Sequence, residues 1–315
     1  MTTAISVQSA TRTFGRTTAL DRMSFSVASG SILGLLGRNG AGKTTIMSII
    51  AGQDRPTAGR VEVLGGEPFE NASVLSQISY VRDNQRYPDD YKLHHVLRIA
   101  PDFAPNWDAD LAAELAEGFR IPTKTKIKKL SRGQLSSIAI VVGIASRASI
   151  TLLDEPYLGL DITARALFHE VLIRDYAEHP RTVVLSTHLV EESERLFDQV
   201  VIVDRGSVVL DVESDEIQNV AYTVSGTADA VDRVTQGRPV LSTHAVGGLK
   251  SATLRGLVDE QVRADARAGG AQLSPVSLQE LVAAFGEYEP DATGGVALDG
   301  REPRTPVDSQ NGARS

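Results

Sequence analysis

Residues 37–44 read GRNGAGKT, which is the spacing of a phosphate-binding loop. Its glycines let backbone N–H groups point at phosphate oxygens, and the N-terminus of a following helix adds partial positive charge. An ordinary glycine-rich turn is the alternative, but an apolar run precedes the loop and a helical run follows it. We expect Lys43 to bridge phosphate oxygens and Thr44 to hold Mg²⁺. The residues expected to contact the phosphates are Gly37, Arg38, Asn39, Gly40, Ala41, Gly42, Lys43, Thr44 and Thr45.

Two further apolar runs end in residues that could do chemistry. TLLDEP at 151–156 places Asp154 at a strand tip, where it could hold Mg²⁺ through water, and Glu155 next to it as a general base for an attacking water. TVVLSTH places His188 just beyond another strand. Ligands of α/β sheets lie outside the carboxyl ends of the strands, so these side chains are expected to share a crevice with Lys43 and the γ-phosphate. If each motif is considered alone, the alternative is that the two acids lie at the solvated start of a loop and that the histidine is a surface residue.

LSRGQ at 130–134 is a second glycine-containing, hydroxyl-bearing element, placed just before an apolar run. By itself it predicts a helix N-terminus with Ser131 as the N-cap. The same geometry would aim backbone N–H groups at an anion, so the two interpretations are compatible.

The elements around these motifs alternate between apolar strands and amphipathic helices. We expect a strand at 31–37 and a helix at 43–52, then a helical subdomain over about 85–135, in which Pro101, Pro105 and Pro122 separate the pieces. From 131 to 212 the pattern predicts helix and strand in turn, including a helix LVEESERLFD at 189–198 and one strand QVVIVDRGSVVL at 199–210. This alternation predicts an α/β layer with a largely parallel sheet.

The pattern of apolar and polar residues changes near residue 212, and this change divides the chain into two parts of unequal size. Residues 1–212 are expected to form the nucleotide cassette, and 213–288 a small accessory α/β domain with strands AYTVSG and SATLRG. Helices are expected at 229–236, 258–269 and 277–288. Residues 289–315 are polar and rich in Pro, Gly and Asp, which predicts a disordered tail.

Composition excludes several function classes. The net charge of −8 argues against broad binding to nucleic acid, which needs a basic surface, so no nucleic-acid partner is expected. With no cysteine, the chain has no disulfide, thiolate metal site or cysteine nucleophile. The N-terminus lacks the layout of a signal peptide, and the longest apolar run, 138–145, is far shorter than the ~20 residues of a membrane span.

Together GRNGAGKT, LSRGQ, LLDEP, LGLD and STH resemble, over about residues 4–212, the nucleotide-binding subunits of ABC transporters. The resemblance implies the P-loop NTPase fold of an ABC ATPase, with a mixed sheet, a helical subdomain and here a small C-terminal α/β accessory domain. It implies ATP and Mg²⁺ as cofactors and hydrolysis by Glu155 with support from His188. Two cassettes would pair head to tail, so that Ser131, Gly133 and Gln134 of one chain meet the ATP of the other.

The resemblance also assigns residues whose motifs are weaker. Phe14 is similar to the aromatic residue that stacks on adenine, the alternative being a core phenylalanine, and Asp161 of LGLD is similar to the acid at the dimer seam. The family's glutamine after a strand like ISYV contacts Mg²⁺ and the membrane partner. Here Asp83 occupies the expected place and Gln85 follows two residues later, so either could serve. Arg132 replaces a glycine of the commoner LSGGQ.

The implied partners are a multi-span membrane permease and a second ATP-binding subunit, identical or related, which would place the chain peripherally at the cytoplasmic face of the cell membrane. The segment FAPNWDADLAAEL and the appended domain resemble ABC-2-type exporter ATPases encoded beside GntR-type regulators. The alternatives are an importer ATPase and, less favoured, a soluble ABC ATPase acting on ribosomes or DNA. The basic run KTKIKK at 124–129 is either a solvated surface or a contact for acidic partner or lipid groups.

Overall fold

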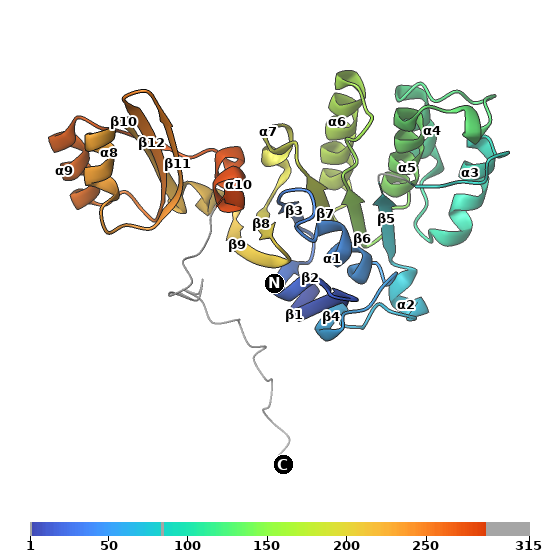
Figure 1. Cartoon of the computed structure of the whole chain (residues 1–315). Helices are drawn as coiled ribbons and strands as arrows, with labels where there is room; N and C mark the ends of the chain where they lie inside the picture. Colours follow the sequence, from blue (N-terminus) through green and yellow to red (C-terminus); the bar gives the residue numbers. More distant parts are fainter. Residues whose placement is uncertain (1, 83–84, 288–315) are drawn as a thin grey trace, which may run out of the picture.

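The computed structural model describes residues 2–82 and 85–287 of the 315-residue chain. These residues form three sheets, two in the cassette and one in the C-terminal part (Figure 1). Asp83 and the tail predicted at 289–315 lie outside the described residues. Among the described helices, none has both the length and the apolar character that crossing a bilayer requires.

The central sheet has six strands in the order β5-β6-β7-β3-β8-β9. Its first five strands run parallel, and β9 pairs antiparallel with β8. The strands are β3 (Ile32–Leu36), β5 (Ile78–Arg82), β6 (Ile150–Asp154), β7 (Thr182–Thr187), β8 (Gln199–Asp204) and β9 (Ser207–Glu213). The single strand expected at 199–210 is therefore wrong: the chain reverses at Arg205 and Gly206, which both have positive φ.

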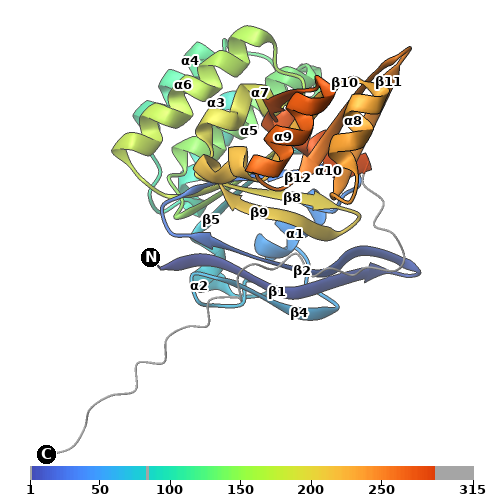
Figure 2. The same ribbon diagram turned by 90° about the vertical axis from the view of Figure 1, so that its left-hand side faces the viewer.

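One face of this sheet is covered by α1 (Lys43–Ile50) and a three-stranded antiparallel sheet. That sheet has the order β2-β1-β4 and comprises β1 (Thr3–Phe14), β2 (Thr17–Ala28) and β4 (Ala58–Val63). Figure 2 shows α1 lying between the two sheets, where its apolar side chains pack into a shared core. A short helix, α2 (Ala72–Leu75), precedes β5.

The remaining cassette helices are α3 (Leu93–Ile99), α4 (Ala109–Gly118), α5 (Arg132–Ala145), α6 (Ile162–Glu178) and α7 (Val190–Ser193). Of these, α5 packs against β5 and β6 of the central sheet, and α4 packs against α5. The helix expected at 189–198 is only the single turn α7 followed by a 3-10 turn, Glu194–Leu196. Just after this turn, the Phe197 ring packs against Gly34 of β3, where a Cβ atom would lie 2.7 Å from the ring.

The C-terminal part has a four-stranded antiparallel sheet in the order β11-β12-β10-β13. Its strands are β10 (Ala221–Thr227), β11 (Val240–Val246), β12 (Leu249–Arg255) and β13 (Gln272–Pro275). Helices α8 (Ala228–Thr235) and α9 (Glu260–Gly269) pack on one face, with Tyr222, Val224 and Leu254 in the core between them. β11 and β13 were not predicted.

The last described helix, α10 (Leu278–Glu287), returns to the cassette and lies between it and the C-terminal sheet (Figure 1). Leu281 and Phe285 are buried in the same cluster as Val190 and Phe197 of the cassette. α10 therefore completes a core that the first part of the chain begins.

Candidate functional site

The phosphate loop joins the end of β3 to the start of α1. Gly37 has a φ of +145°, and a Cβ atom there would lie 2.2 Å from the Val203 carbonyl oxygen, so this position requires glycine. Gly42 is the N-cap of α1, and no side chain of the described residues caps the helix. Within that part of the chain, the first N–H groups of α1 are left for an anion, as an anion site at a helix N-terminus requires.

Lys43 is buried, with 6% of its surface exposed, and bends back over the loop. Its Nζ donates to the Gly37 carbonyl oxygen at 2.8 Å and lies 3.4 Å from both the Arg38 carbonyl oxygen and Glu155 Oε1. Phosphate oxygens could replace the carbonyl oxygens with stronger, charge-assisted contacts. Asn39, Gly40, Ala41, Thr44 and Thr45 complete the same loop and first helical turn.

Glu155 brings the loop lysine and His188 into one cluster. Its Oε2 lies 2.7 Å from His188 Nδ1, while Oε1 faces Lys43 and, among the described residues, has no hydrogen-bond partner. The Glu155 backbone has a φ of +50° and is fixed there by its N–H group, which donates to the Ser186 carbonyl and hydroxyl oxygens at 3.1 and 3.0 Å. A buried carboxylate oxygen that lacks a hydrogen-bond donor is suited to accept a hydrogen bond from a bound water molecule.

Asp154 is held by two hydroxyl groups that belong to residues without a predicted role, Ser186 and Tyr80. Ser186 Oγ donates to Oδ1 at 2.6 Å, and Tyr80 Oη lies 3.4 Å from Oδ2. Burial, and then the negative charge of Asp154, raise the pKa of Tyr80 to about 12, so the phenol stays a donor. One carboxylate and the exposed Thr44 hydroxyl, together with nucleotide phosphates, make the kind of donor set that Mg²⁺ takes.

A signal for Ser186 was present in the sequence. β6 and β7 are parallel neighbours, and the register pairs Asp154 directly with Ser186. Polar residues at the carboxyl ends of adjacent parallel strands meet at one edge of the sheet. The sequence signal for Tyr80 was weaker, because only the folded structure shows that its strand, β5, pairs with β6.

The LSRGQ segment starts α5 with a capping box. The Ser131 hydroxyl accepts the Gln134 N–H at 3.2 Å, and Gln134 Oε1 accepts the Ser131 N–H at 3.0 Å. A Cβ atom at Gly133 would lie 2.2 Å from the Gly159 carbonyl oxygen, so the helix start packs backbone to backbone against the LGLD loop. Glycine is therefore needed at 133 for a reason within the chain itself.

Asp161 in that loop is the N-cap of α6, where its Oδ1 accepts the Ala164 N–H at 2.8 Å. The next residue, Ile162, is 83% exposed. The cap residue Asp161 and the exposed Ile162 are thus neighbours in the chain, just after the Gly159 backbone that packs against the start of α5.

Phe14 and Gln85, two of the residues with weaker motifs, lie at the end of β1 and beyond the end of β5. Phe14 is 50% exposed at the β1–β2 hairpin, so it is not a core phenylalanine, and the Arg12 guanidinium lies over its ring at 4.5 Å. Gln85 follows β5, and its N–H donates to the Arg82 carbonyl oxygen at 3.2 Å. Gln85 therefore lies three residues beyond Arg82, which pairs with Asp154 in the sheet.

The basic run at 124–129 has a structural use. Lys126 and Lys128 both contact Oδ1 of Asp90, at 2.9 and 3.0 Å. Their hydrogen bonds and positive charges lower the pKa of the Asp90 carboxyl. Two of its four lysines therefore join the segment before α3 to the segment before α5.

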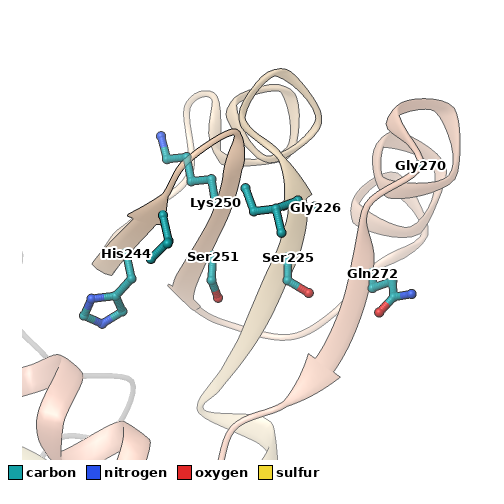
Figure 3. A pocket seen from close by; sticks show the side chains of 9 residues that line it. Ser225, Gly226, His244, Lys250, Ser251, Gly270 and Gln272 are labelled. Carbon is teal, nitrogen blue, oxygen red and sulfur yellow. The ribbon is translucent and has the colours of Figure 1, made fainter.

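A separate cavity of about 450 Å³ lies on the C-terminal sheet (Figure 3). His244, Ser251, Ser225 and Gln272 form a row across it, one from each strand, and are paired in register. None of the residues expected from the sequence to bind nucleotide lines this cavity, so it is distinct from the site at the phosphate loop.

Residues 20–158 match the protein family described as ABC transporter. The chain is 34% identical over 210 residues to an uncharacterized ABC transporter ATP-binding protein of Methanocaldococcus jannaschii, an alignment that covers 65% of this chain and 76% of that protein. It is 30% identical to the Nod factor export ATP-binding protein I of Rhizobium leguminosarum, covering 64% and 67%. With an aliphatic sulfonates import ATP-binding protein of Burkholderia lata it shares 28% identity, covering 76% and 75%.

The fold agrees with these similarities. A solved structure of an ATP-binding subunit of an ABC transporter superposes with a TM-score of 0.63 at 25% identity, over 68% of this chain and 92% of that one. Because the archaeal relative is matched over most of its length, the chain belongs to the family of ABC transporter ATP-binding proteins and is an ATPase.

Proposed function

We propose that this chain is the ATP-hydrolysing subunit of an ABC-2-type exporter and powers a separate multi-span permease. The observation that carries the catalytic part is the Glu155 carboxylate, which faces Lys43 with one oxygen and His188 with the other. Similarity to the Nod factor export protein supports export. The segment FAPNWDADLAAEL, in which Asp108 caps α4, supports the subgroup encoded beside GntR-type regulators.

In this proposal the loop N–H groups and Lys43 bind the β- and γ-phosphates, while Thr44 and Asp154 hold Mg²⁺. The ion supplies positive charge that neutralises the phosphates. Glu155 accepts a proton from the attacking water, whose oxygen bonds to the γ-phosphorus as the bond to ADP breaks. His188 orients Glu155 through Nδ1 and leaves Nε2 for a γ-phosphate oxygen. Gln85 and Asp83 remain the candidates for the residue that links Mg²⁺ to the permease.

We propose that two chains pair head to tail around two ATP molecules. Ser131, Gly133 and Gln134 of one chain would cap the ATP held by the other, and Asp161 would lie at the seam. The contact between Gly133 and Gly159 supports this, because it places the LSRGQ segment and the LGLD loop side by side, so both could meet the same partner. A two-fold axis makes both contacts reciprocal, and the partner would be a second copy or a related subunit. Through the permease, the pair would sit at the cytoplasmic face of the membrane.

An importer subunit is the second candidate. The alignment with the sulfonates import protein extends over 245 residues, compared with 209 for the Nod factor export protein. Transport in inverted membrane vesicles distinguishes the two: ATP-driven uptake into inverted vesicles means export, and ATP-driven release from them means import.

The test of the proposal is to purify a tagged Glu155→Gln variant from its own cells with ATP and mild detergent. Removing the general base should lower the hydrolysis rate by about 10²- to 10⁴-fold while ATP still binds, so the closed complex accumulates. A multi-span membrane protein in the purified complex supports the proposal. Ribosomal or nucleic-acid material without a membrane protein, or near-normal hydrolysis, contradicts it. Glu114→Gln, which removes a surface ion pair with Arg174, is the matched control.

A further inference from the structure

Phe14 has a cation over its ring and is half exposed. The Arg12 guanidinium lies over the ring with its central carbon 4.5 Å from the centroid, within the range of a cation–π contact. Arg12 and Phe14 are two residues apart on β1, so their side chains point to the same side of the strand. Half of the Phe14 surface is still exposed.

Arg12 is itself fixed by a carboxylate. Its Nε and Nη2 contact Asp54 Oδ2 and Oδ1 at 2.9 and 2.8 Å, which is a bidentate pair, and both side chains are about three-quarters buried. Asp54 Oδ1 also accepts the N–H of Arg55 at 2.8 Å. The planar guanidinium is thus held by its edge, with its flat face left to stack on the ring.

Asp54 lies in the segment that leaves α1, the helix that the phosphate loop begins. That segment is bonded to β1 at Thr57, whose N–H donates to the Thr11 carbonyl oxygen at 2.6 Å and whose hydroxyl accepts the Thr13 N–H at 3.2 Å. The hairpin also reaches the loop directly, because a Cβ atom at Gly42 would lie 2.9 Å from Leu20 Cδ2. Phe14 is therefore carried on a hairpin that contacts the phosphate loop before α1 and the segment that follows α1.

We propose that Arg12 is a positioning residue for the nucleotide base: held by Asp54, it supports one face of Phe14 and leaves the opposite face for adenine. The inference rests on the proposed role of Phe14 as the residue that stacks on adenine. A ring held from behind loses less freedom when a base stacks on it, so ordering Phe14 in advance strengthens binding. Arg12 makes no contact with the phosphates in this arrangement, so its effect must depend on the base.

The experiment compares two probes, ADP and inorganic pyrophosphate, titrated by calorimetry into the full-length protein. Phe14→Ala should raise the Kd for ADP about tenfold, since it removes an aromatic stacking surface. Arg12→Met, which keeps much of the stem but not the guanidinium, should raise it about threefold. Neither change should alter the Kd for pyrophosphate. The double variant should match Phe14→Ala alone, because Arg12 acts through the ring.

The possible failures can be told apart. If Phe14→Ala weakens ADP selectively and Arg12→Met does not, Arg12 is no positioning residue while Phe14 keeps its role. If Arg12→Met weakens ADP and pyrophosphate equally, its effect is structural and the inference is wrong. If Phe14→Ala leaves the Kd for ADP unchanged, both the proposed role of Phe14 in stacking on adenine and the inference about Arg12 are wrong. Arg174→Met, which breaks an ion pair on α6, is the control and should change neither Kd.

Discussion

The hydroxyl group of Ser186 donates to Oδ1 of Asp154 at 2.6 Å, and its oxygen accepts the N–H of the next residue, Glu155, at 3.0 Å. A single buried side chain on β7 therefore fixes both acids at the end of β6. The carboxylate is oriented before any ligand arrives, and the left-handed backbone at Glu155 is held in place.

Ser186→Ala should lower the free energy of unfolding by about 1.5–3 kcal/mol, because a buried carboxylate loses a hydrogen bond. Chemical denaturation measures this loss. The matched control is Ser146→Ala, whose buried hydroxyl donates to the Gly143 carbonyl oxygen in its own helix and which should cost about 0.5–1.5 kcal/mol. The variant should also hydrolyse ATP more slowly than the control. Equal losses in both properties would mean that Ser186 only fills space.

Gly133→Ala should destabilise the protein by about 1–3 kcal/mol, because the added methyl group meets the Gly159 carbonyl oxygen at 2.2 Å and two backbone segments must separate. Thermal unfolding measures the change. Gly248→Ala is the matched control: it lies on a turn with open space around it and should be close to neutral. Unchanged stability of the Gly133→Ala protein would contradict this prediction, because α5 and the LGLD loop would then separate at no cost in free energy.

His169 predicts a pH dependence of stability. Burial lowers its pKa below the ordinary value of 6.5, and its Nε2 is buried without a hydrogen-bond partner among the described residues. The unfolded chain therefore takes up a proton at a higher pH than the folded protein does. The stability associated with neutral His169 is fully present above pH 6.5 and is lost as pH falls through the folded-state pKa.

His169→Phe should remove this dependence and retain the ring contact with Tyr157, whose centroid lies 5.2 Å away. Unfolding curves of both proteins between pH 7.5 and 5.5 check the prediction. The original protein should lose stability relative to the variant as the solution becomes more acidic, and the gap should stay constant above pH 7. Parallel curves throughout would contradict it.

Leu281→Ala in α10 should lower the free energy of unfolding by about 2–5 kcal/mol, because the side chain is fully buried against the cassette and its removal leaves a cavity. Denaturant titration followed by near-ultraviolet circular dichroism measures the loss. Leu257→Ala is the control, since that leucine is 65% exposed and should cost less than about 0.5 kcal/mol. Similar effects for the two leucines would mean that α10 adds little to the cassette core.

The parts of the site that the sequence predicts are those with local signals. The phosphate loop follows from glycine spacing, and the grouping of Lys43, Asp154, Glu155 and His188 follows from the rule that parallel strands end at one edge. The contacts of Ser186 with Asp154 and of Arg12 with Asp54 needed the folded structure, because the partners are 32 and 42 positions apart in the sequence. The first contact follows from the register of β6 and β7, and the second from the position of the segment after α1. No short window of sequence contains such a pair.

The missed elements have physical reasons as well. β11 carries exposed side chains from Thr243 to Val246, so it lacks the apolar alternation of a half-buried strand. β13 has only four residues and ends in Pro275. The turn at Arg205 and Gly206 was overlooked because valine-rich runs on both sides read as one strand, although an RG pair is compatible with the positive φ that reversal needs.

The position of α10 also bears on how the protein is made. Translation releases residues 1–212 long before 278–287, yet Leu281 and Phe285 complete the hydrophobic cluster around Val190 and Phe197. Domains usually fold in the order of synthesis, but here the first part must wait with apolar side chains uncovered. Contacts over such separations also slow folding. A chain that stops before α10 during translation therefore leaves that surface open to aggregation.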